Sequence, residues 1–212
     1  VAFDREGRRG ATAGSLEAVV LWDLDAGTEI RRFPLDGDGN GSDLSADGSR
    51  LAAVSSDGRL KVWDIASGVL VGEVGTRHGT ADDVVFLPGT DELLTTGGDG
   101  MVRLWTRGVP VLVREWKAHD ARTSDFALVP DGRTVVTGGW DGRVRAWRIS
   151  DGARLWDRAV TTALIVGMSV TADGRTVAVA SRDGMTRLFD VATGAPVVTT
   201  PDALEGHAGA IV

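Results

Sequence analysis

The chain has 212 residues, of which 42% are hydrophobic and 25% charged, and this composition excludes a disordered or fibrous chain. No apolar run reaches the roughly 20 residues that a membrane-spanning helix needs, and a net charge of −7 provides no broad positive surface for nucleic acid. The lack of cysteine excludes disulfides, thiolate metal sites and thiol nucleophiles. We therefore expect neither a nucleic-acid partner nor a membrane partner.

One aromatic residue ends each of five apolar segments at an almost constant spacing. The intervals between these residues are 41, 42, 42 and 42 positions. A fixed period of this length indicates a repeat architecture in which each repeat is one supersecondary unit. The five residues, in chain order, are Trp22, Trp63, Trp105, Trp147 and Phe189.

Three glycine-containing turns divide each repeat. In the second repeat they lie at Asp47-Gly48, Asp57-Gly58 and Gly68, which are 16 and six residues before the tryptophan and five residues after it. Asp-Gly between two alternating segments is typical of a hairpin with a type I′ turn, which needs positive φ at both central positions. The second turn recurs at Asp99-Gly100, Asp141-Gly142 and Asp183-Gly184, whereas the first repeat has Gly-Ser-Leu-Glu there.

Three turns divide each repeat into four short strands, which are rich in β-branched and apolar residues. The second repeat predicts strands at Arg50 to Ser55, Arg59 to Asp64 and Val69 to Val74, after an inner strand at residues 42–46. Each four-stranded meander has two apolar faces, which only stacking against neighbouring repeats can bury. The sequence therefore predicts an all-β fold of five antiparallel blades. We expect one region over residues 1–212, with blades at approximately 1–35, 41–76, 82–117, 124–160 and 166–200.

The repeats resemble the WD-repeat family of β-propellers. The resemblance covers essentially the entire chain and rests on Trp22-Asp23, Trp63-Asp64 and Phe189-Asp190, on the variants Trp105-Thr106 and Trp147-Arg148, and on histidines 27 and 28 residues before Trp105 and Trp147. It implies that a hydrogen-bonded set of His, Ser or Thr, Asp and Trp ties each blade together by satisfying buried polar groups. Two repeats match this set fully, with His78, Thr95, Asp99 and Trp105 in one and His119, Thr137, Asp141 and Trp147 in the other.

The number of repeats raises the question of ring closure. Residues 206–212, which include His207, start a further repeat, while Val1-Ala2-Phe3 read as the end of an inner strand. A part of a larger ring and a five-bladed ring whose ends meet both fit this pattern. We favour an open arc or partial ring, because the family rarely closes with five blades, and exposed edges would then promote self-association. The 21 arginines against two lysines indicate a bacterial source, and we expect a larger bacterial protein.

Motifs that carry chemistry are missing from the sequence. The three histidines are 41 and 88 residues apart and follow the repeat, which favours a structural role over metal ligation. No nucleophile elbow, phosphate-binding loop or dinucleotide fingerprint is present, so we expect no enzyme activity, cofactor or metal. Asp36, Asp38, Asn40 and Gly41 have the opening spacing of a calcium loop, with Asp47 at its twelfth position.

The extended inner strand argues against that calcium site. At about 3.3 Å per residue, residues 42–46 would carry Asp47 too far away to reach the same ion. We therefore favour a solvated acidic loop that replaces a missing histidine. Weak calcium binding by Asp36, Asp38 and Asn40 alone stays open.

Surface positions provide the candidate partner-binding residues. The residue before the turn aspartate should lie at the rim of one propeller face, and exposed Trp and Arg are enriched at interface hot spots. Trp140 and Arg182 hold this position, as Ser56 and Gly98 do in other repeats. Further candidates near the entrance of the central channel are Arg122, Asp83 and Asp125.

Each of these candidates has a structural alternative. Trp140 could be folded over its neighbouring blade, and the charged residues could form a hydrated channel wall. Trp116 and Trp156 lie on predicted outermost strands. This position favours a role in packing or edge protection over a role in a ligand site.

Three functional hypotheses follow. The resemblance implies a non-enzymatic scaffold or sensory and regulatory module in signalling, which presents loop residues to a protein partner or to another domain of the same longer chain. The missing cysteines and signal segment lead us to expect a cytoplasmic location. One alternative is a fragment of a quinone-cofactor-dependent propeller dehydrogenase, whose repeats are similar in carrying Gly before a docking Trp, as Gly152 precedes Trp156. Another alternative is a purely structural spacer whose faces bind nothing.

Overall fold

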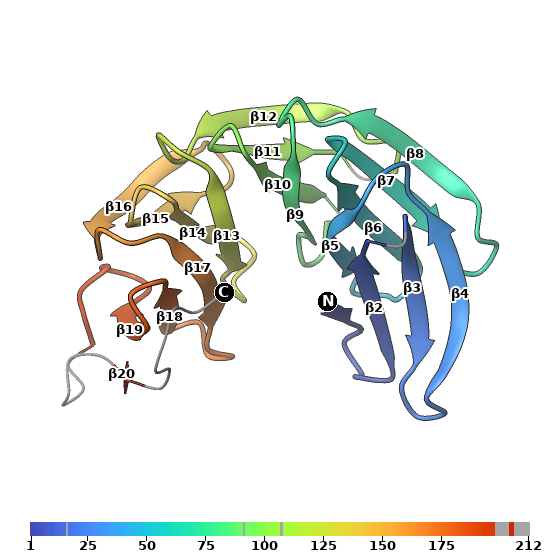
Figure 1. Cartoon of the computed structure of the whole chain (residues 1–212), viewed down its shortest axis with the longest axis horizontal. Coiled ribbons are helices and arrows are strands. Elements are labelled where there is room, and N and C mark those ends of the chain that lie inside the picture. Colours follow the sequence, from blue (N-terminus) through green and yellow to red (C-terminus); the bar gives the residue numbers. More distant parts are fainter. Residues whose placement is uncertain (16, 91, 107, 198–203, 206–212) are drawn as a thin grey trace. The chain divides into compact units, whose positions relative to one another are not determined.

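The computed structural model describes residues 1–15, 17–90, 92–106, 108–197 and 204–205. Strands, turns and irregular segments make up this part of the chain, and no helix in it is long and apolar enough to be a candidate membrane span. The strands form five antiparallel sheets of four strands each, in which neighbours in sequence are neighbours in the sheet (Figure 1). The predicted all-β fold of five four-stranded antiparallel sheets is confirmed.

The strand bounds follow the repeat. The first sheet consists of β1 (Ala2–Phe3), β2 (Arg9–Gly14), β3 (Ala18–Asp23) and β4 (Thr28–Pro34), and the second of β5 (Gly39–Leu44), β6 (Arg50–Ser55), β7 (Arg59–Asp64) and β8 (Leu70–Gly75). The third consists of β9 (Ala81–Phe86), β10 (Leu93–Gly97), β11 (Met101–Trp105) and β12 (Leu112–Lys117), and the fourth of β13 (Thr123–Leu128), β14 (Thr134–Gly139), β15 (Arg143–Arg148) and β16 (Ala153–Ala159). The fifth consists of β17 (Ile165–Val170), β18 (Thr176–Ser181), β19 (Met185–Asp190) and β20 (Leu204–Glu205).

The turn between the second and third strands differs from the type I′ prediction. Gly58, Gly142 and Gly184 have φ values of 79°, 71° and 83°, but the aspartate before each of them does not have positive φ. The Gly58 amide donates to the Ser55 carbonyl at 2.9 Å. This is a type I turn followed by a left-handed glycine. The type I′ interpretation was wrong because the aspartate side chain stabilises the turn differently: Asp57 Oδ1 accepts the Arg59 amide at 3.2 Å.

The first repeat forms the same turn without the glycine. Glu17 takes the left-handed position with φ of 52°, and its carbonyl accepts the Leu35 amide at 2.8 Å. The Gly58 carbonyl accepts the Thr76 amide in the same way, also at 2.8 Å. The turn is therefore imposed by the sheet around it, because a residue with a Cβ atom is disfavoured in this conformation.

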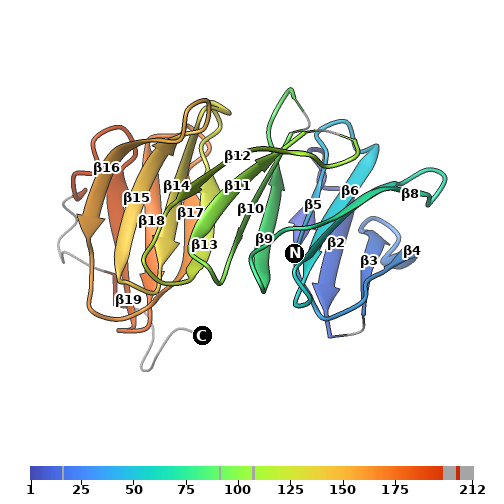
Figure 2. The same cartoon turned by 90° about the horizontal axis from the view of Figure 1, so that it is seen from above.

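Contacts divide the chain into two compact units. The first comprises Val1–Gly98 and Val102–Glu115, and the second comprises Asp99–Met101 and Trp116–Val212. Each unit buries its sheets against one another. In Figure 2, the axes of β14, β15 and β18 of the second unit are nearly aligned, with β14 and β15 antiparallel.

Stacking buries both faces of a sheet, as the sequence predicts. In the first unit, Leu51 of β6 lies in a cluster with Phe33 of the first sheet, while its neighbour Ala52 lies in a cluster with Phe86 of the third. Successive strand residues point to opposite faces, so one apolar strand serves two cores. A third cluster, in the second unit, joins the fourth and fifth sheets through Val136, Val144, Ile165, Val177 and Phe189.

The two ends of the chain enter different sheets. β1 pairs with β2 in the first sheet, and β20 pairs with β19 in the fifth. No sheet of the described residues contains strands from both ends. Residues 206–212, which we expect to start a further repeat, lie outside the described residues.

Candidate functional site

A chain of hydrogen bonds surrounds His119 in the fourth sheet. Its Nε2 lies 2.9 Å from Thr137 Oγ1, and the same oxygen accepts the Trp147 indole N–H at 2.9 Å. On the other side of the ring, Nδ1 lies 2.9 Å from Asp141 Oδ1. His119 and Thr137 are buried, so these bonds satisfy polar groups that water does not reach. All four residues of the expected set are in contact here.

The third sheet contains the corresponding arrangement around His78. His78 Nε2 lies 2.9 Å from Thr95 Oγ1, which accepts the Trp105 indole N–H at 2.9 Å. These three residues belong to the first unit. Asp99 belongs to the second, where its Oδ1 accepts the Met101 amide at 3.1 Å.

A basic residue two positions before the aromatic residue completes both arrangements, and the sequence analysis missed it. Arg103 Nη1 lies 2.6 Å from His78 Nδ1, and Arg145 Nη1 lies 2.7 Å from His119 Nδ1. Arg145 also forms ion pairs with Asp141 and, through its Nε, with Asp157 at 2.8 and 3.1 Å. The signal was a basic residue at a constant interval, namely Lys61, Arg103, Arg145 and Arg187.

Two groups of opposite charge compete for Nδ1 of His119. Arg145 Nη1, which can only donate, lies 2.7 Å from it, and the Asp141 carboxylate, which can only accept when ionised, lies 2.9 Å from it, so the tautomer of the ring depends on which of the two Nδ1 pairs with. Burial lowers the pKa of His119, although the neighbouring Asp141 opposes this. Burial alone would raise the pKa of Asp141, but the hydrogen bond from Arg145 and the neighbouring His119 lower it overall. The cluster is a neutral imidazole between ionised partners that already bind one another, which is an arrangement that holds the blade together.

The exposed candidates gather at one end of the second unit. Trp140 is 41% exposed, and the guanidinium carbon of Arg122 lies 5.1 Å from its ring centroid, within the range of a cation–π contact. Arg182, also exposed, occupies the same place in the fifth sheet. The Trp140 amide donates to the Arg122 carbonyl, and the Arg182 amide to the Leu164 carbonyl, each at 2.9 Å.

The loops that carry these residues are joined to each other. Ser124 Oγ, at the start of β13, donates to the carbonyl of Ile165, at the start of β17, at 2.6 Å. Arg122 lies two positions before Ser124, and Leu164 lies one position before Ile165. Trp140, Arg122 and Arg182, which we call the Trp140 face, therefore share one end of two hydrogen-bonded neighbouring sheets.

Asp125 has a different environment from the Trp140 face. Its Oδ1 accepts the Phe126 amide at 2.8 Å, and its Oδ2 accepts the Met168 amide of the neighbouring sheet at 2.6 Å. Asp43 makes the equivalent bridge in the first unit, to the Phe86 amide at 2.7 Å. Asp83 Oδ1 accepts the Val84 amide at 2.9 Å. The geometry favours a structural role for Asp125, since both of its oxygens are bound by backbone amides.

The buried carboxyl of Asp125 makes stability depend on pH. Burial raises the pKa of Asp125 to about 6, although the hydrogen bonds from the Met168 and Phe126 amides lower it. Because the folded state then holds this proton more tightly than the unfolded chain, stability is greatest below the ordinary carboxyl pKa and falls as pH rises through 6. Between pH 5 and 7, we expect the free energy of unfolding to fall by about 1 kcal/mol more in the wild type than in Asp125→Asn. Urea titrations at several pH values measure this difference.

A matched carboxylate provides the control for this prediction. A hydrogen bond from the Thr171 hydroxyl lowers the pKa of the exposed Asp173. Asp173→Asn should therefore alter the dependence of the free energy of unfolding on pH only at pH values below the ordinary pKa of a carboxyl group. Parallel profiles for the wild type and Asp125→Asn above pH 5 would show that the buried carboxyl does not titrate there.

The acidic loop of the calcium hypothesis is used for other contacts. Asp36 Oδ2 accepts from the buried Lys61 at 2.6 Å, and the Asn40 side-chain amide donates to the Ala81 carbonyl at 2.8 Å. Asp47 accepts hydrogen bonds from Ser45 and Ser49 in its own turn. No group of three or more His, Asp or Glu side chains that could hold a metal is found in the part of the chain that the structure describes. The positions of Asp36 and Lys61 match those of His78 and Arg103, so this ion pair replaces the histidine.

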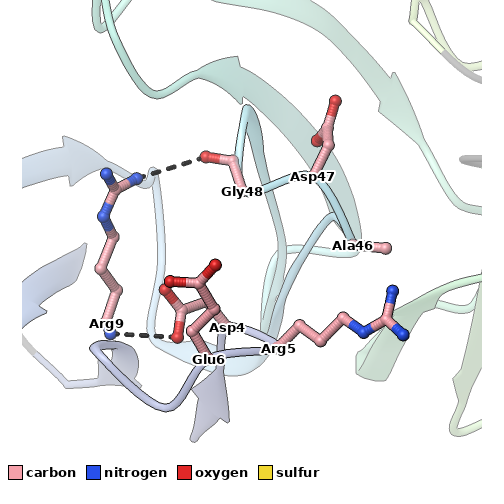
Figure 3. Close-up of a pocket in the computed structure, with 7 residues that line it drawn as sticks. All are labelled: Asp4, Arg5, Glu6, Arg9, Ala46, Asp47 and Gly48. Carbon is pink, nitrogen blue, oxygen red and sulfur yellow. Dashed lines mark hydrogen bonds between the residues drawn. The ribbon is translucent and has the colours of Figure 1, made fainter.

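Two cavities lie at turns rather than at the Trp140 face. One, of about 370 Å³, lies in the first unit between the turns after β1 and β5, and Figure 3 shows its lining. Its charges are mixed, with Asp4 and Glu6 beside Arg5 and Arg9, and Arg9 also donates to the Gly48 carbonyl at 3.4 Å. The other, of about 260 Å³, lies in the second unit. Its lining includes Val129, Leu155, Arg175 and Asp190.

The two outer-strand tryptophans are packing residues. Trp156 is 7% exposed, and its indole N–H donates to the Val191 carbonyl of the next sheet at 2.8 Å. Trp116 is also buried, with its ring centroid 6.4 Å from that of Trp147. A Cβ atom at Gly152 or Gly194 would press against Trp116 or Trp156, respectively.

Comparison with known proteins agrees with this geometry. A search of curated proteins gives no match. Three segments, residues 38–64, 73–106 and 110–148, match the family model described as WD domain, G-beta repeat. They span the second to fourth sheets, which carry the buried histidine clusters and the Lys61–Asp36 pair. These three segments are similar to WD repeats, and the match is consistent with the WD-repeat resemblance of the sequence.

Proposed function

We propose that this chain is a non-catalytic interaction module and that the Trp140 face contacts its protein partner. WD repeats generally mediate protein–protein interactions. The observation that carries the proposal is Trp140, which is 41% exposed beside Arg122 at the end of two joined sheets. A large aromatic side chain flanked by arginine is the composition of an interface hot spot.

The rest of this end supports a binding role. Arg182 is exposed and forms no ion pair or side-chain hydrogen bond with the described residues. By contrast, Asp183, its neighbour in the chain, is bound by Thr161 and Arg187 at 2.8 and 2.9 Å. The turn is therefore held from within while Arg182 points outward from it, which preorganises the face for a partner.

The experiment places a photoreactive phenylalanine derivative at position 182 in the protein expressed in its native host. We expect irradiation to produce one dominant adduct that is lost when Trp140→Ala is added. A second protein in the adduct identifies an external partner, whereas a cross-link within a longer chain identifies another domain. Titration of the identified partner against Trp140→Ala should then show at least tenfold weaker binding.

The matched control carries the same probe at position 175. Arg175 is an exposed arginine of the same sheet, in the turn between β17 and β18, and so lies at the end opposite to Arg182. No adduct at either position would favour the spacer hypothesis, whereas equal adducts at both would show that the Trp140 face is not a specific contact.

A further inference from the structure

We infer that the cavity between the turns after β1 and β5 binds a small zwitterion of the α-amino acid class, whose carboxylate contacts Arg9 and whose ammonium group contacts Asp4. The inference goes beyond the proposed function, since this cavity lies in the first unit and the Trp140 face lies in the second. It is carried by the size of the cavity, by the chemistry of its lining and by the partners of the charged side chains in that lining.

The walls of the cavity are fixed before any ligand binds. Its volume of about 370 Å³ falls within the range of about 300–1,000 Å³ that small-molecule sites have. The turn after β1 is held by Asp4, whose Oδ1 accepts the Arg8 and Arg9 amides at 2.8 and 3.2 Å. Apolar residues just before the two turns, Ala2 and Leu44, belong to one buried cluster. The two turns are therefore anchored to the same core, which lowers the entropy cost of binding.

The lining favours a ligand that carries both signs of charge. Among the described residues that line the cavity, only Ala46 has an apolar side chain, so an apolar ligand would gain little contact. The charged lining residues are the acids Asp4, Glu6 and Asp47 and the bases Arg5 and Arg9. Because the two signs nearly balance, a lone anion or a lone cation would meet both attraction and repulsion, whereas a zwitterion complements both sets.

Arg9 provides the group that binds the carboxylate. Its guanidinium donates to the Gly48 carbonyl at 3.4 Å and forms no ion pair with any described residue, so further N–H groups remain for a ligand. Paired N–H groups of this kind bind a carboxylate bidentately. In Figure 3, the Arg5 and Arg9 side chains lie on opposite sides of the Asp4 and Glu6 carboxylates. Opposite charges are thus presented next to one another in the same cavity.

Asp4 provides the acceptor for the ammonium group. Its Oδ1 holds the turn, while its second oxygen accepts no hydrogen bond from the described residues. Glu6 lies nearby and contacts Arg8 only at 3.6 Å, in a pair so exposed that it contributes little. Asp47 differs, because hydrogen bonds from the Ser45 hydroxyl and other donors of its own turn lower its pKa to about 2. Its carboxylate is therefore used by the turn, and the ligand meets Asp4 instead.

The cavity of about 260 Å³ in the second unit shows that the repeat does not require these charges. It lies at the corresponding turns of the fourth and fifth sheets, and its lining includes Val129 and Thr134. Counted from the glycine of each turn, these residues hold the positions of Asp4 and Arg9. The turn there is held by Asp131, which accepts the Thr134 amide at 3.0 Å. The pair of Asp4 and Arg9 is therefore a property of the first cavity and not of the fold.

The test is an NMR titration of the isotope-labelled whole chain with free alanine and with two derivatives that each lack one charge. N-acetylalanine has no ammonium group, and alanine amide has no carboxylate. We expect millimolar alanine to shift the backbone amide signals of Arg9 and Gly48 in a saturable way, and each derivative to bind at least fivefold more weakly. The signals of Thr134 and Gly174, which line the cavity of the second unit, should stay in place.

Three variants locate the binding. Arg9→Gln should weaken the binding of alanine at least fivefold, and Asp4→Asn, which keeps an oxygen acceptor for the turn, should do the same. Arg8→Gln removes the same charge as Arg9→Gln from the same turn, at an exposed residue outside the lining, and should change the affinity less than twofold. Unchanged amide signals away from the cavity check that each variant is folded.

Several outcomes would overturn the inference. Equal binding of alanine and N-acetylalanine would show a plain anion site, and equal binding of alanine and alanine amide would show a plain cation site. Equal losses from Arg9→Gln and Arg8→Gln would show diffuse charge attraction. Signals of Arg9 and Gly48 that do not shift would show that the cavity binds no amino acid. None of these results bears on the cross-linking experiment at position 182, which tests the proposed function in the other unit.

Discussion

Replacement of Arg145 by leucine is expected to lower the free energy of unfolding by about 1.5–3 kcal/mol, because it removes a charged hydrogen-bond donor from two partly buried carboxylates. Arg145 is 6% exposed and binds Asp141, Asp157, His119 and the Ala118 carbonyl. Leucine fills part of the space but provides no donor for the two carboxylates. Urea denaturation at pH 7 measures the change.

An exposed arginine of the same strand is the control. Arg148 pairs with Asp151 at 2.7 Å, but about half of each side chain is exposed. Arg148→Leu should therefore change the free energy of unfolding by less than about 1 kcal/mol. Similar small losses for Arg145→Leu and Arg148→Leu would mean that Arg143 and Arg154 compensate Asp157 and that Asp141 reaches water.

The sequence predicts the strands well because each strand is bounded by local chemistry. Two of the strands expected in the second repeat, β6 and β7, have the predicted bounds, since glycine turns end them on both sides. The hairpin type was wrong for a physical reason. Asp-Gly also fits a type I turn in which the aspartate carboxylate accepts the amide two residues later, so the dipeptide alone does not separate the two turns.

The candidate site was predictable only in part. The period placed Trp140 and Arg182 at equivalent rim positions, which follows from counting along the repeat. The position of Arg122 over Trp140 depends on a loop conformation that no spacing encodes. The bridge from Asp125 to the Met168 amide joins residues 43 positions apart and depends on the register between two sheets. A long-range contact of this kind becomes visible only when the sheets are packed.

The glycine of the hairpin turn is expected to tolerate no side chain. Gly142 has φ of 71°, and a Cβ atom there would collide with the Thr161 carbonyl oxygen. The Gly142 carbonyl also accepts the Val160 amide at 3.0 Å, so the loop cannot retreat without losing this bond. Gly142→Ala should lower the free energy of unfolding by about 2–5 kcal/mol, of which about 1–2 kcal/mol comes from the left-handed backbone and about 1–3 kcal/mol from overpacking. Thermal and urea unfolding measure the total.

A second left-handed glycine separates these two contributions. Gly27 has φ of 64°, but no other atom lies within 4 Å of the place where its Cβ atom would be. Gly27→Ala therefore loses only the free energy of the backbone strain, about 1–2 kcal/mol. The difference in free energy of unfolding between the two variants then measures the cost of the clash with the Thr161 carbonyl. If both variants lose the same stability, the loop yields to the methyl group. The glycine would then be required only for its backbone conformation, a role that Glu17 already fills in the first repeat at a φ of 52°.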